Sequence, residues 1–193
     1  MTFFEAFQQF DGNLLIGIQH ALNAEWLTPI MKAINMFGEK GLSFITLCVV
    51  LVACKKTRRI GIICGASLLM AFVLCNLTIK PLVMRIRPWV TFPAVNAMLP
   101  PPGDASFPSG HATNSMAPAW AFYLSTRAEG GKLHKAGIAL VILSLLIALS
   151  RLYLGMHYPS DVICGLLLGM LCATIVWSVY KRISDKRLKI TDK

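Results

Sequence analysis

Long apolar runs, broken by short polar or basic turns, set the pattern of this chain. Residues 60–79 carry no charged side chain and have about the 20-residue length that a membrane-spanning helix requires. Residues 136–149 and 162–177 are also apolar, and residues 42–54 form a shorter run of the same kind. The pattern predicts an all-α membrane protein, a polytopic helix bundle of about six transmembrane helices.

Two segments depart from this simple pattern. Residues 111–124 combine Pro118 with several polar side chains, so this helix should face protein and not lipid. Residues 1–40 are interrupted by polar side chains, and we expect an interfacial helix there, followed by a short spanning helix. No basic flank precedes an apolar run at the N-terminus, so we predict no cleaved signal peptide. The chain is interpreted as one membrane-embedded domain over residues 1–193.

Composition narrows the class of protein. Hydrophobic residues make up 55% of the chain and charged residues 15%, which is too apolar for a soluble domain of this size. The six cysteines lie within or at the ends of apolar runs without a CxxC pair, which is typical of packing residues and not of a metal site. We therefore expect no metal and no cofactor. Small residues recur at four-residue spacing within 61–65 and 165–173, which predicts close helix packing.

The basic residues indicate an orientation in the membrane. Thirteen of the nineteen lysines and arginines fall in residues 55–59, 127–135 and 181–193. Short loops rich in these residues stay in the cytoplasm, so we expect these three segments and both chain termini to be cytoplasmic. Residues 181–193 would then form a cytoplasmic tail of a plasma-membrane or inner-membrane protein. The net charge of +10 reflects this topology, and no surface typical of nucleic-acid binding appears.

Polar side chains gather where the same topology places the outer ends of the helices. Lys80 and Arg87 are seven residues apart, so both could point the same way from a helix that Pro88 should end. Pro81 threatens that geometry, because it removes one backbone hydrogen bond. An outer loop of about twenty residues follows, and structured loops of this length are usually functional. We therefore expect the side chains of Lys80 and Arg87 to place two positive charges just before this loop.

A second polar group lies at the far end of the loop and in the turn near residue 155. Ser109 can cap the next helix, and Gly110 lets backbone N–H groups approach an anion. Arg151 ends the following apolar run. The turn GMHYPSD (155–161) can bring Asp161 to His157. With the two cations before the loop, this set predicts a phosphate-binding site.

Three motifs carry a resemblance to a known family. KPLVMRIRP (80–88), PSGH (108–111) and SRLYLGMHYPSD (150–161) resemble, in order and at every specified position, the signature motifs of the type-2 phosphatidic acid phosphatase superfamily. The resemblance covers residues 80–161 closely and points to the small bacterial integral-membrane branch. No motif covers the first forty residues.

The resemblance implies a role for each motif residue. His157 would attack phosphorus and form a phosphohistidine, Asp161 would hold its imidazole, and His111 would act as the general acid. The phosphoryl oxygens would be bound by the remaining positions, which are Lys80, Arg87, Ser109, Gly110 and Arg151.

Other polar and aromatic residues near these motifs are given structural roles. Arg85 lies off the motif pattern and is interpreted as a headgroup contact. Trp89, Tyr153 and Tyr158 are interpreted as aromatic residues of the membrane interface. His20 and His134 are interpreted as interfacial or loop residues.

The resemblance implies a metal-independent phosphatase that removes the terminal phosphate of a lipid phosphate or diphosphate at the outer membrane face. Undecaprenyl diphosphate, phosphatidylglycerol phosphate and phosphatidic acid are the substrate types implied, and the isoprenyl carrier is favoured. One alternative is a phosphotransferase that passes the phosphoryl group to another acceptor. Another is a non-enzymatic lipid-binding or transport protein. The vanadium haloperoxidases share the motifs, but their scaffolds are soluble. The sequence leaves the lipid and the oligomeric state open.

Overall fold

The computed structural model describes the backbone of residues 2–128 and 130–191, and side chains up to residue 186 apart from residues 1, 40 and 129. Within these ranges all regular structure is helical, which confirms the all-α prediction. The helices in chain order are α1 (Phe3–Leu22), α2 (Leu27–Gly38), η1 (Glu39–Gly41), α3 (Leu42–Ala53), α4 (Arg58–Phe72), η2 (Val73–Ile79), α5 (Lys80–Val83), α6 (Pro88–Thr91), α7 (Gly110–Thr126), α8 (Gly131–Tyr153) and α9 (Pro159–Thr191).

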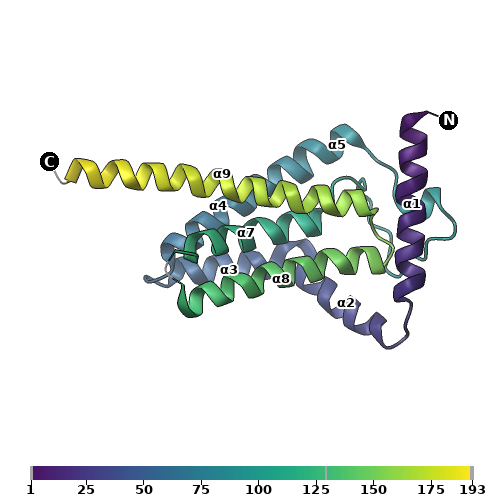
Figure 1. Cartoon of the computed structure of the whole chain (residues 1–193), viewed down its shortest axis with the longest axis horizontal. Helices are drawn as coiled ribbons and strands as arrows, with labels where there is room; N and C mark the ends of the chain where they lie inside the picture. Colours follow the sequence, from purple (N-terminus) through teal and green to yellow (C-terminus); the bar gives the residue numbers. More distant parts are fainter. Residues whose placement is uncertain (1, 129, 192–193) are drawn as a thin grey trace.

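Helix α7 is the centre of the bundle. It packs against α4, α8 and α9, and Figure 1 shows it between them. Its small and polar side chains, such as Thr113, Ser115 and Ala117, are buried along most of its length. Because this helix contacts protein on all sides, it needs no lipid-facing apolar surface, as its sequence predicted.

Glycines allow α9 to lie close to α7. A Cβ atom at Gly165 would stand 2.8 Å from the carbonyl oxygen of Ser109, and one at Gly169 would stand 2.7 Å from that of Thr113. Gly61 lets α4 approach α3 in the same way, whereas a Cβ at Gly65 would meet nothing closer than 4.0 Å. The predicted small-residue packing therefore holds at three of these four glycines.

Proline 81 changes the helix that carries the first motif. Proline has no N–H and its ring clashes with the carbonyl four residues earlier, so a regular α-helix cannot continue through it. The chain widens into the π-helix η2 just before this point, and α5 ends at Val83, where Met84 takes a positive φ of 47°. The predicted helix up to Pro88 is therefore wrong, and Arg87 lies on an extended segment before α6.

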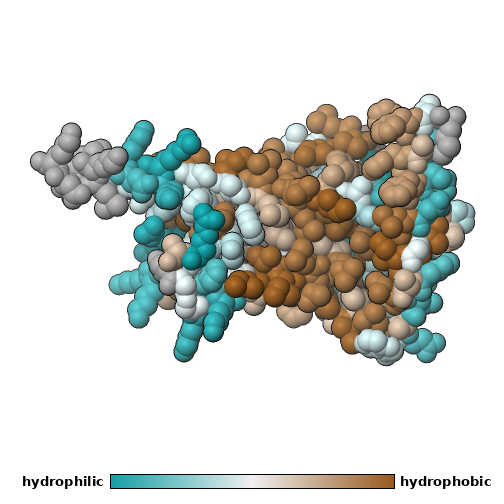
Figure 2. All heavy atoms as spheres, in the orientation of Figure 1, coloured by the Kyte–Doolittle hydropathy of each residue, from teal (hydrophilic) through white to brown (hydrophobic). Residues whose placement is uncertain are grey.

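The apolar surface is that of a membrane protein. Among the described residues, three helical stretches are long and apolar enough to cross a bilayer, namely Arg58–Thr91, Gly131–Tyr153 and Pro159–Lys186. Helices α2 and α3, bent by 49°, form a fourth candidate if the pair is one span. The count of about six spans is not confirmed. Figure 2 shows a broad hydrophobic band across the middle of the bundle on the face in view.

Helix α1 crosses one end of the bundle (Figure 1). One face carries exposed aromatic side chains, among them Phe3, Phe7 and Phe10, while Asp11, Leu15 and Gln19 are buried against the other helices. The opposite end of the bundle holds the α3–α4 turn, the α7–α8 turn and the far part of α9. All three predicted basic segments therefore lie at one end of the molecule, apart from the side chains beyond Lys186, which lie outside the described residues.

Two tyrosines near the third motif are buried, so their interpretation as interface aromatics is wrong. The Tyr153 hydroxyl donates to the carbonyl of Ala24 at 3.0 Å and lies 2.7 Å from Thr28 Oγ1. Tyr158 is fully buried beneath the guanidinium of Arg85, whose Cζ lies 3.9 Å from the ring centroid. Helices α1 and α2 dock onto the ends of α8 and α9 and cover both rings. The prediction missed this burial because hydropathy along the chain does not reveal contacts between distant helices.

Candidate active site

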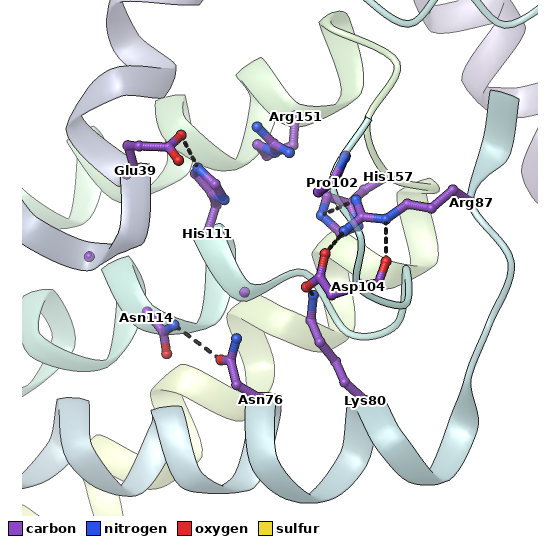
Figure 3. A pocket seen from close by; sticks show the side chains of 13 residues that line it. Glu39, Asn76, Lys80, Arg87, Pro102, Asp104, His111, Asn114, Arg151 and His157 are labelled. Atoms are coloured by element: carbon purple, nitrogen blue, oxygen red, sulfur yellow. Dashed lines mark hydrogen bonds and ion pairs between the residues drawn. The ribbon is translucent and has the colours of Figure 1, made fainter. Parts of the chain in front are cut away.

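A cavity of about 330 Å³ opens at the end of the bundle that α1 crosses. Figure 3 shows the residues that line it, which come from α2, η1, η2, α5, α7, α8 and the segments after α5, α6 and α8. Six of the eight predicted site residues are among them, namely Lys80, Arg87, Gly110, His111, Arg151 and His157. The other two, Ser109 and Asp161, are fully buried next to these residues. The structure therefore brings all three motifs together.

His157 presents one edge of its imidazole to the cavity and the other to the protein. It lies in the turn between α8 and α9, where Gly155 takes a φ of +70°. Its Nε2 atom is 3.2 Å from Arg87 Nη1, and its Nδ1 atom is 3.5 Å from both Asp161 Oδ2 and Ser106 Oγ. Burial, followed by the charges of Arg151, Arg87 and Lys80, lowers the pKa of His157 well below its ordinary value. The ring is therefore neutral at pH 7, as a nucleophile requires.

The Asp161 carboxylate accepts three hydrogen bonds and lies beside His157. Its Oδ2 atom accepts hydrogen bonds from Ser106 Oγ at 2.5 Å and from the backbone N–H of Tyr158 at 3.1 Å. Its Oδ1 atom accepts a charge-assisted bond from Arg85 Nη1 at 2.5 Å. His157 Nδ1 lies 3.5 Å from Oδ2. This carboxylate is positioned to orient the imidazole.

Arg85 corrects a prediction made from the sequence. It does not extend to a lipid headgroup; it lies inside the protein, and its Nη2 atom donates to Asp11 Oδ2 at 2.7 Å. On a continuous helix Arg85 and Arg87 would point to nearly opposite sides. Because the helix ends at Val83, both side chains instead turn inward from the extended segment.

Asp104 is a site residue that the sequence reasoning missed. Its carboxylate accepts from Lys80 Nζ and from Arg87 Nη2, the latter at 2.5 Å. Lys80 Nζ also donates to the carbonyl of Ala105 at 3.0 Å. Burial alone would raise the pKa of Asp104, but Lys80 and Arg87 outweigh it and lower that pKa below its ordinary value. Asp104 is the one acidic residue between Arg87 and His111, which is the signal that could have found it.

His111 lies across the cavity from His157 (Figure 3). It occupies the first turn of α7, and its Nε2 atom is 3.7 Å from Glu39 Oε2 of η1. A Cβ at Gly38 would stand 2.7 Å from the imidazole, so this glycine makes room for the ring. Neither Gly38 nor Glu39 belongs to a motif, and the sequence reasoning did not select them. The two histidines therefore face a common space from opposite sides.

Ser109 does not cap α7, contrary to the prediction. It occupies the N-cap position, but its side chain makes no capping bond, and its buried Oγ has no hydrogen-bond partner among the described residues. Its backbone N–H instead donates to the carbonyl of Asp161 at 3.0 Å, which fixes the serine against α9. Leaving a buried hydroxyl unpaired costs about 1–3 kcal/mol, so such a group indicates a place for a ligand oxygen.

Arg151 and Gly110 complete the walls of the cavity. Arg151 is 4% exposed, and its Nη1 atom donates to Asn35 Oδ1 of α2. Its Nε atom has no partner within the described part of the chain. A Cβ at Gly110 would meet Asn76 Nδ2 at 3.4 Å and Lys80 at 3.9 Å, so the glycine leaves this wall open. The cations Lys80, Arg87 and Arg151 thus surround a space suited to a phosphate dianion.

Among the described residues, no group of three or more His, Cys, Asp or Glu side chains lies close enough to hold a metal ion. Four of the six cysteines are buried, Cys164 is partly buried and Cys54 is exposed.

Comparison with known proteins agrees with this geometry. Residues 60–185 match the PAP2 superfamily. The chain is 35% identical over 168 residues to decaprenylphosphoryl-5-phosphoribose phosphatase of Mycobacterium tuberculosis. The aligned region covers 86% of this chain and 88% of that protein. It is 31% identical over 159 residues to undecaprenyl-diphosphatase BcrC of Bacillus subtilis, covering 82% and 76%.

The fold has a solved counterpart as well. The crystal structure of a transmembrane PAP2 type phosphatidylglycerolphosphate phosphatase from Bacillus subtilis superposes with a TM-score of 0.74 at 25% sequence identity. The match covers 92% of this chain and 88% of that one. Both the sequence and the architecture therefore agree with the motifs, and the chain belongs to the PAP2 superfamily of lipid phosphatases.

Proposed function

We propose that this protein hydrolyses the terminal phosphate of a membrane lipid phosphate or diphosphate through a phosphohistidine at His157. The observation that carries the proposal is the pair of histidines that face one cationic cavity from opposite sides. His157 Nε2 is turned toward this cavity while its Nδ1 faces Asp161. The catalytic motifs lie within residues 80–161 of a single domain that spans residues 1–193.

In the first step His157 Nε2 attacks phosphorus, and the bond from phosphorus to the leaving oxygen breaks. His111 gives its proton to that oxygen, while Asp161 stabilises the imidazole as it becomes positively charged. The phosphoryl oxygens are bound by Lys80, Arg87 and Arg151 together with Ser109 and the backbone N–H of Gly110. Such positioning and charge stabilisation supply most of the catalysis of phosphoryl transfer.

In the second step water attacks the phosphohistidine. His111, now neutral, accepts a proton from the water, and the phosphorus–nitrogen bond breaks. The products are inorganic phosphate and the original His157. Lys80, Arg87 and Arg151 stabilise the phosphoryl oxygens in both steps, so no metal ion is needed for charge compensation.

An apolar groove beside the cavity supports a lipid substrate. This groove has a volume of about 360 Å³ and lies between α3 and α4, where Ile45, Val49 and Leu69 line it. It shares Gly41 and Asn114 with the polar cavity, so the two spaces adjoin. A phosphate in the cavity can therefore remain attached to a chain that lies against membrane-facing helices.

The relatives favour an isoprenyl lipid as the substrate type. Their names refer to a decaprenylphosphoryl phosphoribose and to undecaprenyl diphosphate. A long isoprenyl chain also fits this groove, whose lining is apolar apart from Asn114. We place the cavity at the extracytoplasmic face of the plasma or inner membrane, with both termini in the cytoplasm, because the basic segments lie at the other end of the bundle.

A substrate panel tests the proposal. Purified protein in detergent should release free phosphate from an isoprenyl phosphate or diphosphate, phosphatidylglycerol phosphate or phosphatidic acid, with EDTA present. His157→Ala serves as the inactive control. Transfer of the phosphoryl group to a second lipid without free phosphate would favour a phosphotransferase. Absence of both products on a folded protein would favour the lipid-binding alternative.

A further inference from the structure

Asp11 is a buried carboxylate far from the three motifs in sequence. It lies on the inner face of α1 with a side chain that is 4% exposed. Its Oδ1 atom accepts from the backbone N–H of Ser160 at 3.1 Å. Its Oδ2 atom accepts from Ser160 Oγ and from Arg85 Nη2, the latter at 2.7 Å. A helix outside the motifs therefore contacts the first turn of the helix that carries Asp161.

One guanidinium is shared between two buried carboxylates. Arg85 donates through Nη2 to Asp11 and through Nη1 to Asp161, and its side chain is 15% exposed. The group of Asp11, Arg85 and Asp161 carries one net negative charge. When His157 attacks phosphorus its ring gains one positive charge, which this net negative charge balances. If Arg85 paired with Asp161 alone, that balancing charge would be lost.

We propose that Asp11 is a positioning residue for the reaction at His157, acting through Arg85. It adds a second carboxylate to the guanidinium that Asp161 also binds, so the charge of Arg85 is shared and the group keeps one net negative charge to stabilise the charged imidazole. The proposal rests on the proposed function of His157 as the nucleophile. It also gives α1 a role in the chemistry beyond covering the end of the bundle.

A second polar anchor on α1 separates this role from simple docking. Gln19 lies eight residues after Asp11 on the same face, with Leu15 between them. Its Nε2 atom donates to the carbonyls of Tyr153 at 3.0 Å and Asn96 at 2.9 Å, and its Oε1 atom accepts from the N–H of Asn96 at 3.1 Å. These bonds hold α1 in place without touching Arg85 or Asp161.

The first experiment compares single variants of the purified full-length protein. Asp11→Asn should slow phosphohistidine formation by roughly tenfold or more, within the range of about 10²-fold that misplaced catalytic groups cost, with little change in KM. Asp11→Glu keeps the charge and should recover most of the rate. Gln19→Ala weakens the docking of α1 without removing a member of the Asp11, Arg85 and Asp161 group, and it should lose less than Asp11→Asn. Glu5→Gln, an exposed carboxylate on the same helix, should match the wild type.

The decisive experiment is a charge-restoring double variant. Arg85→Gln leaves two buried carboxylates without a cation, and its activity should fall further than that of Asp11→Asn. Adding Asp11→Asn to Arg85→Gln returns the group to one net negative charge. The double variant should therefore form the phosphohistidine faster than Arg85→Gln alone, by about threefold or more.

Three outcomes would overturn the proposal while the wild type still releases phosphate. They are a wild-type rate for Asp11→Asn, an equal loss in Gln19→Ala, and a double variant no faster than Arg85→Gln. If Asp11→Asn does not fold, two other comparisons of the rate of phosphohistidine formation decide the question. One compares Asp11→Glu with Gln19→Ala, and the other compares the double variant with Arg85→Gln. A wild type that acts on no lipid phosphate would instead contradict the proposed function.

Discussion

At the scale of single residues, Asp104 lines the cavity to which the proposed function assigns the substrate phosphoryl group. Its carboxylate contacts Lys80 and Arg87, the two cations that the proposed function assigns to phosphate. Although burial opposes ionisation, these cations keep the pKa of Asp104 below its ordinary value. The carboxylate is therefore ionised at neutral pH and competes with an incoming anion for the same donors.

Replacing Asp104 by asparagine should strengthen the binding of small anions. Asp104→Asn removes the competing charge but keeps a side chain of similar size, so orthovanadate should inhibit at roughly fivefold lower concentration, equivalent to about 1 kcal/mol. The measurement is the inhibition constant of orthovanadate for the purified wild type and for Asp104→Asn. An inhibition constant that is unchanged or higher would mean that Asp104 serves to hold Lys80 and Arg87 in place.

The two histidines should respond differently to the leaving group. In the proposed mechanism, loss of His157 removes the nucleophile, so His157→Ala should be nearly inactive on every substrate. Loss of His111 removes the proton for the leaving oxygen, so His111→Ala should lose ~10²–10⁴-fold more activity on a lipid monoester than on p-nitrophenyl phosphate. Rates of phosphoenzyme formation are to be compared, because His111 also assists the second step.

Trapping the intermediate provides the control for this assignment. Acid-labile, base-stable phosphate should accumulate on the wild type but not on His157→Ala. If His157→Ala kept its turnover while His111→Ala lost the phosphoenzyme on every substrate, the two roles would have to be exchanged.

The pH dependence should report the surroundings of His157. Burial, then Arg151, Arg87 and Lys80, lower the pKa of this residue, and the neutral form is the reactive one. Its protonation should therefore reduce kcat/KM only below the ordinary histidine range of about 6.5. Arg151→Gln removes one cation, so the acid limb should move to higher pH. Both proteins should be measured on the same substrate, so that the ionisation of the substrate affects both pH profiles equally. Acid limbs that superimpose would contradict this account.

The motif residues could be predicted from the sequence, and their supporting residues could not. Lys80, Arg87 and Arg151 were selected by residue type and spacing, and they line one cavity as expected. Arg85 was given the wrong role because its partner Asp11 lies 74 positions away in the sequence. Such pairs depend on how α1 docks, which no local pattern encodes.

At the scale of helices, faces were predicted correctly only where the helix was regular. The spacing at residues 80–88 favours a helix that Pro81 threatens. In the structure a π-helix precedes Pro81 and the helix ends at Val83. The central helix with Pro118 was correctly expected to face protein, because its small and polar residues extend over its whole length. The composition of a whole helix predicts its surroundings even where the helix is locally distorted. The direction of one side chain is predicted only where the helix is regular.

Glycines between α7 and α9 should be far more sensitive to substitution than glycines on open surface. A Cβ at Gly169 would press on the backbone oxygen of Thr113, so Gly169→Ala should destabilise the protein by about 1–3 kcal/mol. Gly65→Ala, with 4.0 Å of space, should be neutral or stabilising, because alanine favours helix by about 1 kcal/mol. Thermal unfolding in detergent gives both values. Equal shifts at the two positions would show that this helix contact is not tight.

At the scale of the whole molecule, the two ends of the bundle differ in charge and in role. The cavity lies at the end covered by α1, and the basic turns lie at the other end, with an apolar belt between them (Figures 1 and 2). A polar cavity at the edge of such a belt can receive a lipid headgroup while the chain remains in the membrane. The arrangement predicts which end faces the cytoplasm.

Labelling of single cysteines on whole cells tests this orientation. In a cysteine-free background, cysteines at Trp89 or Gly103, near the cavity, should react with a membrane-impermeant thiol reagent. Cysteines at Thr57 or Ala128, in the basic turns, should react only after the membrane is opened, because positively charged short loops remain in the cytoplasm. Opening the membrane also controls for poor accessibility, since all four positions should then react. Labelling of Thr57 and Ala128 on intact cells, with Trp89 and Gly103 protected, would place the cavity at the cytoplasmic face and reverse the proposed topology.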